Sequence, residues 1–73
     1  MSQVELVQKA QDIAHVAMIK MEYAIKMAEK SDTSPNFKDY YTNKANNARI
    51  EFESLMDKIN QLLETAENMD TED

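Results

Sequence analysis

Apolar residues recur every three or four positions along the second half of the chain. Their spacings of four and three place them on one side of an α-helix, as the a and d positions of four heptads. They are Tyr41, Ala45, Ala48, Phe52, Leu55, Ile59, Leu62, Ala66 and Met69, widened by Phe37, Met56 and Leu63. The pattern predicts an amphipathic helix that packs against another helix.

The first half of the chain carries a stripe of the same spacing that is mostly alanine. It consists of Val7, Ala10, Ala14, Ala17, Met21, Ala24 and Ala28. Small side chains let two helix backbones approach closely, so the larger residues of the second half can pack down onto this stripe. We therefore predict that the two stripes form one shared seam.

A second apolar stripe lies on the first half, roughly opposite the alanine stripe at about 100° per residue. Its members are Val16, Ile19, Tyr23 and Met27. A two-helix hairpin cannot bury both faces of one helix, so we predict these four residues as contacts for a partner helix or for a second copy. The alternative is that they stay partly exposed, as many apolar side chains do.

Tyr40 is a further candidate contact, because it lies outside the seam and close to Lys38 and Lys44. An exposed tyrosine beside a turn can act as a binding hot spot. The alternative is an aromatic plug that closes the end of the bundle.

Capping signals predict where the helices begin and end. Ser2 and Glu5 form a capping box, and Pro35 suits the first position of a new helix with Ser34 as its cap. We predict a helix over 2–30, a turn over 31–34, a helix over 35–68 and a frayed acidic tail over 69–73. So short a turn forces antiparallel neighbours, and the fold class is therefore all-α, a coiled-coil-like antiparallel two-helix hairpin.

The chain has 73 residues with no cysteine, no glycine and one proline. A chain this short buries little core, and without cysteine it has no disulfide to stabilise it. We therefore expect the hairpin to be completed by dimerisation or by a partner helix.

The net charge of −6 is uneven along the chain. Residues 1–49 hold seven basic and six acidic residues, whereas residues 50–73 hold Lys58 and eight acidic residues. This balance disfavours nucleic acid and anionic membranes as partners. No apolar run approaches the roughly 20 residues of a membrane span, and the N-terminus lacks a signal-peptide pattern, so we predict a cytoplasmic protein.

Candidate chemistry is sparse. The single histidine, His15, falls on the polar face of the first helix, three residues from Asp12. Carboxylate bundles that hold iron need two Glu-x-x-His motifs aimed into the core, and no other catalytic or metal-binding pattern occurs. We predict no catalytic residue, no cofactor, no metal and no small-molecule substrate.

The layout resembles the small co-chaperones of type III secretion needle subunits. The resemblance rests on the alanine-rich first helix, the short turn, the segment Phe37-Lys38-Asp39-Tyr40-Tyr41 and the apolar run from Ala48 to Ile59. It covers most of the chain and is mainly architectural. It implies a helical hairpin that cooperates with a second chaperone to keep a needle subunit soluble before export.

Three functional hypotheses follow from these patterns. The first is a non-enzymatic protein–protein interaction module, such as a chaperone or adaptor of a secretion system. The second is a self-assembling structural bundle. The third is an acidic inhibitor that occupies a basic site on its target.

Overall fold

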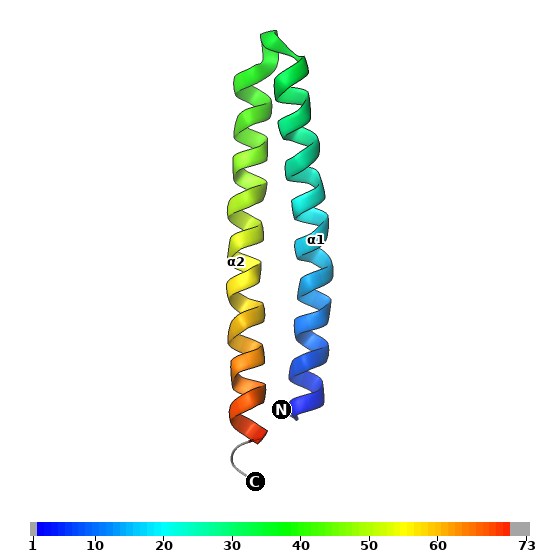
Figure 1. Ribbon diagram of the computed structural model, residues 1–73, viewed down its shortest axis with the longest axis vertical. Helices are drawn as coiled ribbons and strands as arrows, with labels where there is room; N and C mark the ends of the chain where they lie inside the picture. The colour runs from blue at the N-terminus through cyan, green and yellow to red at the C-terminus, as the bar shows by residue number, and fades with distance from the viewer. Residues whose placement is uncertain (1, 71–73) are drawn as a thin grey trace.

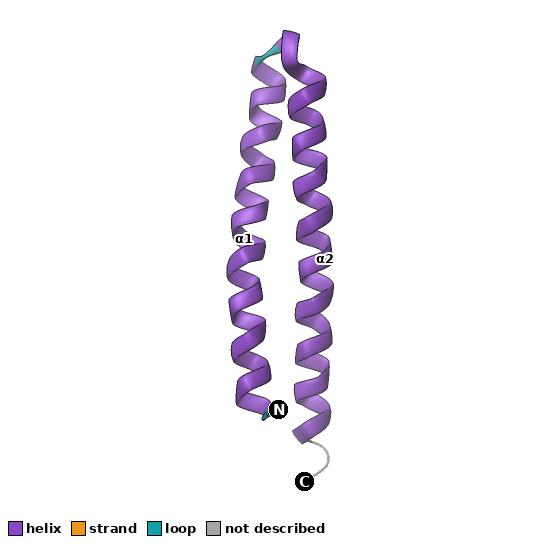
Figure 2. Cartoon of the chain, turned by 180° about the vertical axis from the view of Figure 1, so that it is seen from behind, coloured by secondary structure: helices purple, strands orange, loops and turns teal. Residues whose placement is uncertain are grey.

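The computed structural model describes residues 2–70, which form a helical hairpin (Figure 1). Helix α1 spans Gln3–Thr33, a short 3₁₀ helix η1 spans Pro35–Phe37, and helix α2 spans Lys38–Asp70. The long helices lie side by side along a rod of 59 × 14 × 13 Å, with the turn at one end and the start of α1 and the end of α2 at the other (Figures 1 and 2). The predicted all-α antiparallel hairpin is therefore confirmed.

The N-terminus of α1 is capped as the sequence predicts. Ser2 is extended, with φ −77° and ψ 161°, and its side chain accepts a hydrogen bond of 3.2 Å from the backbone N–H of Glu5. This bond satisfies one of the backbone donors that a helix start leaves without an intrahelical partner.

The turn is shorter than predicted, because α1 continues through Thr33. Ser31 is buried, and its hydroxyl donates to the Lys38 carbonyl at 3.3 Å and shares a 2.7 Å hydrogen bond with the Thr42 hydroxyl. A helical Ser31 thus finds partners on α2, which offset the low helix propensity of serine. The predicted turn over 31–34 is wrong for its first three residues.

Two further boundary predictions change. Pro35 begins η1 as expected, but Ser34 makes no side-chain capping hydrogen bond, so its predicted capping role is wrong. Helix α2 continues to Asp70, which makes residues 69–70 of the predicted tail helical; residues 71–73 lie outside the described part of the chain.

The seam on α2 is the one that the sequence predicts. All nine of its positions, from Tyr41 to Met69, are buried or half-buried. The residues expected to widen it do not become core, since Phe37, Met56 and Leu63 are exposed.

The seam on α1 is shifted from the prediction by one residue at alternate positions. It keeps Ala10, Ala17 and Ala24, whereas the predicted members Val7, Met21 and Ala28 are exposed. The observed seam positions are Leu6, Ala10, Ile13, Ala17, Lys20, Ala24, Met27 and Ser31. This register buries the larger Leu6 and Met27, half-buries Ile13, and brings Ser31 to its partners on α2.

The core combines small residues of α1 with large residues of α2. Ala10 and Ala17 are buried against Ile59, and the half-buried Phe52, Leu55 and Leu62 pack around them with Ile13 and Ala14. Small side chains in one helix leave room for the branched and aromatic side chains of the other, which permits a close approach of the two backbones.

The burial of Ile59 makes a direct test of this seam possible. We expect Ile59→Ala to lower the free energy of unfolding by about 2–4 kcal/mol, because it removes a buried side chain and leaves a cavity. Ile50→Ala is the matched control: Ile50 is 56% exposed on α2, and its replacement should change stability by less than about 0.5 kcal/mol. Urea unfolding followed by circular dichroism measures both, and equal losses would contradict the seam.

Candidate functional site

Two long faces flank the seam, each built from both helices. In both helices, the residues one position earlier in the sequence than each seam residue share one face. A shallow groove on this face is lined by residues that include Lys9, Lys58 and Thr65. Residues directly after the seam positions share the other face, where two adjoining grooves lie along Met18, Met21, Ile25 and Arg49. We call these the lysine face and the methionine face.

The lysine face carries three of the predicted partner contacts. Val16, Ile19 and Tyr23 precede the seam positions Ala17, Lys20 and Ala24, and all three are exposed as expected. They form a continuous apolar strip along the middle of α1.

Met27 does not belong to this strip. Its side chain is only 7% exposed and lies in the seam, so its predicted place among the outer contacts is wrong. A strip on one helix face advances by alternating steps of three and four residues. From Tyr23 the next step on the lysine face is three residues, to Lys26, whereas the step of four to Met27 enters the seam.

Tyr40 lies outside the core at the turn end of the lysine face. Its ring meets that of Tyr41 edge-to-face, with centroids 5.3 Å apart and an interplanar angle of 75°. The Lys44 ammonium lies 5.5 Å from the centroid of Tyr40, and the Lys30 ammonium lies 5.7 Å from that of Tyr41. The half-buried Tyr41 thus closes the hairpin end, while the exposed Tyr40 is held in place by a neighbouring ring and a cation.

Basic residues are concentrated on this face. Of the eight basic residues in the chain, six lie on it or reach it from the seam: Lys9, Lys20, Lys26, Lys30, Lys44 and Lys58. Against them stand only Glu5, Asp12 and Glu51 among the described residues of the face. A protein with a net charge of −6 therefore presents one positive surface.

Lys20 joins the seam to this face. It occupies a core position of α1, but its ammonium reaches Glu51 on α2 at 2.6 Å, with the two side chains 40% and 55% exposed. An ion pair this exposed contributes at most about 1 kcal/mol, so a charged residue at this position is not explained by stability alone.

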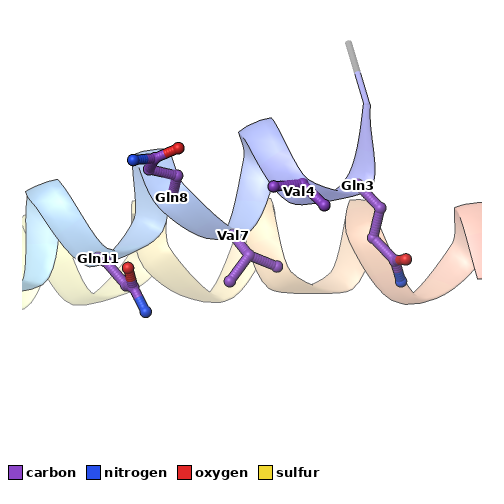
Figure 3. Close-up of a pocket in the computed structure, with 5 residues that line it drawn as sticks. All are labelled: Gln3, Val4, Val7, Gln8 and Gln11. Atoms are coloured by element: carbon purple, nitrogen blue, oxygen red, sulfur yellow. The ribbon is translucent and has the colours of Figure 1, made fainter.

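The methionine face is the surface that the sequence analysis missed. Val4, Val7, Met18, Met21 and Ile25 of α1 are exposed there, and α2 adds Met56 and Leu63. At its N-terminal end, Figure 3 shows Gln3, Val7 and Gln11 pointing to the same side of α1, with Gln8 pointing the other way. The absence of charge along these α1 positions is the signal in the sequence that indicates this face, whereas the predicted seam includes Val7 and Met21.

The described residues offer no arrangement suited to metal chemistry. His15 is exposed, and residues 2–70 contain no group of three histidine, cysteine or carboxylate side chains placed to bind a metal ion. Within the same residues, neither helix is long and apolar enough to cross a membrane.

Comparison with protein-family models, with curated proteins and with solved structures finds no match to this chain.

The position of Lys20 generates a prediction that separates stability from function. We expect Lys20→Leu to raise the free energy of unfolding by about 1 kcal/mol, because a leucine at a seam position gains more from burial than the exposed ion pair contributes. Lys26→Leu, six residues further along α1 at an exposed position of the lysine face, is the control and should bring no comparable gain. Urea unfolding decides: a loss of stability in Lys20→Leu would show that the pair with Glu51 stabilises the hairpin.

Proposed function

We propose that this hairpin is a non-enzymatic protein-binding module whose lysine face recognises an acidic amphipathic helix of another protein. The observation that carries the proposal is the clustering of six lysines around exposed Val16, Ile19, Tyr23 and Tyr40 in a chain of net charge −6. Such a surface offers an apolar strip for contact and a basic border for orientation.

The apolar strip would supply the affinity. An amphipathic helix lying along the middle of α1 would remove Val16, Ile19 and Tyr23 from water, at about 25 cal/mol for each Å² of apolar area buried. Tyr23 and Tyr40 present large, rigid side chains, which are enriched among the residues that contribute most to binding. Tyr40 is already held by Tyr41 and Lys44, so little further order is lost when it binds.

The lysines would supply the choice of partner and its orientation. Ammonium groups at Lys9, Lys26, Lys30 and Lys58 border the strip along much of its length. They attract a helix with carboxylates beside its apolar stripe and disfavour a basic one, which acts on association rate and specificity more than on affinity.

A protein partner fits this face better than a polyanion. A uniformly charged nucleic acid or membrane would meet the carboxylates of Glu5 and Asp12 on the face itself and a net-acidic molecule around it. An amphipathic helix can place its few acids beside the lysines and its apolar residues on the strip.

A narrower proposal is that the module is a small chaperone or adaptor. Its support is the resemblance in layout to the co-chaperones of type III secretion needle subunits, carried by the alanine-rich α1 and by residues 37–41 at the start of α2. A chaperone of that kind would cover an amphipathic helix of its client, which is the partner chemistry that the lysine face suits.

The direct test uses two designed peptides of about 21 residues, each an amphipathic helix with leucine at the a and d positions. One carries glutamate beside its leucines and the other carries lysine. We expect the labelled glutamate peptide to bind at least about tenfold more tightly than the lysine peptide, with affinity falling as salt rises. Fluorescence anisotropy measures both, and tighter binding of the lysine peptide would instead favour the acidic-inhibitor hypothesis.

The chain supplies a matched pair of variants for the same assay. Ile19 and Ile50 are 57% and 56% exposed, the first on the lysine face and the second on the outer side of α2. We expect Ile19→Glu to weaken binding of the glutamate peptide by at least about tenfold, with helicity retained, and Ile50→Glu to leave it unchanged. Adding Tyr23→Glu should abolish binding. If Ile19→Glu binds like the wild type, the lysine face is not the site.

A further inference from the structure

We infer that the methionine face is covered by a second copy of this chain, so that two hairpins stack face to face as a four-helix bundle. This face lies on the other side of the seam from the lysine face. The inference is therefore independent of the partner proposed above.

The α1 half of this face has no charged residue over seven turns. Its positions from 4 to 28 are Val4, Val7, Gln11, Ala14, Met18, Met21, Ile25 and Ala28. Seven of these eight are apolar, and only Ala14 among them is half-buried rather than exposed. This run matches the pattern of a helix that packs against two neighbours, yet α2 covers only one side of it.

The α2 half of the face continues the apolar surface across the hairpin. Phe52 is half-buried between the helices and lines both grooves together with Met21 and Ile25. Met56 and Leu63 are exposed beside it. A contiguous apolar surface of this length on a small protein is typical of an interface.

Charge decides in favour of a second copy. Two chains of net charge −6 repel each other, so they can associate only through a surface that carries little charge. Over residues 4–67 the charged residues of this face are Asp32 at the turn end, Arg49 and Glu53, which pair at 3.4 Å within one chain, and Glu67. A surface with so few charges offers little that selects a particular foreign partner. A two-fold stacking that sets α1 against α1 of the second copy places no charged group opposite the apolar run from Val4 to Ala28.

The size of the face is sufficient for a stable dimer. A rod 59 Å long and 14 Å wide has a footprint of about 800 Å² on one side, which is of the same order as the accessible area that each partner buries in a standard protein interface. The hairpin also needs such an addition. Among residues 2–69 the buried apolar residues are four alanines with Leu6, Met27 and Ile59, and small scaffolds with so little core usually associate.

Three isoleucines on three different surfaces allow a matched experiment. Ile25, Ile19 and Ile50 are 54%, 57% and 56% exposed, on the methionine face, the lysine face and the outer side of α2. We expect light scattering after size exclusion to give the wild type a mass of about 17 kDa, twice the 8.4 kDa of one chain. Ile25→Glu should run as a monomer over about 1–100 µM, while Ile19→Glu and Ile50→Glu stay dimeric.

The same experiment can overturn the inference. A wild type of 8.4 kDa at every concentration would do so, as would a dimer that Ile25→Glu leaves intact. Loss of peptide binding in Ile19→Glu with the dimer preserved, and loss of the dimer in Ile25→Glu, are separate readouts, so each proposal can fail without the other.

A cysteine experiment guards against the possibility that Ile25→Glu simply unfolds. The chain has no native cysteine, so Met18→Cys and Ile50→Cys each introduce a single reactive thiol. With a bis-maleimide linker we expect Met18→Cys, in the middle of the methionine face, to give a covalent dimer in high yield and Ile50→Cys to give little. Equal yields from the two variants would contradict a dimer through this face.

Discussion

The hairpin depends on the fit between the small residues of α1 and the large residues of α2. Ala10 and Ala17 leave the space that Ile59 and its half-buried neighbours fill, so the two backbones can lie close together over their length. The interaction is apolar and short in range, and it leaves one contact line between two helices. Because this seam is narrow, many apolar side chains of α1 remain exposed on either side of it.

A single seam cannot cover all the apolar residues that α1 carries. The side of each helix directly away from the seam is largely polar, as at His15, Glu22 and Glu29, but the two flanks are not. One flank holds the strip of Val16, Ile19 and Tyr23 and the other holds the run from Val4 to Ala28. The exposed apolar surface of α1 is therefore divided mainly between two faces with separate charge environments.

Charge separates these two faces into different kinds of surface. On the lysine face, cations border an apolar strip, and one of them, Lys20, extends from a seam position to pair with Glu51. On the methionine face the corresponding positions of α1 are uncharged. A basic border suits a partner of opposite charge, whereas an uncharged surface suits a copy of an acidic chain, and the two forms of association do not compete for the same residues.

The sequence by itself determined the helices, their antiparallel arrangement and the seam of α2, since these rest on local periodicity, on the cap at Ser2 and on the shortness of the turn. It also identified Val16, Ile19, Tyr23 and Tyr40 as residues outside the core. The register of α1 was decided only by the tertiary structure, because apolar residues occupy both the seam positions and the positions next to them, and periodicity alone does not choose between Leu6 and Val7 or between Ile13 and Ala14. Packing against α2 and the hydrogen bonds of Ser31 make that choice, which buries Met27 and leaves Met18, Met21 and Ile25 exposed. The grouping of lysines was equally out of reach of a linear reading, since Lys9 and Lys58 belong to one face only once the helices are paired.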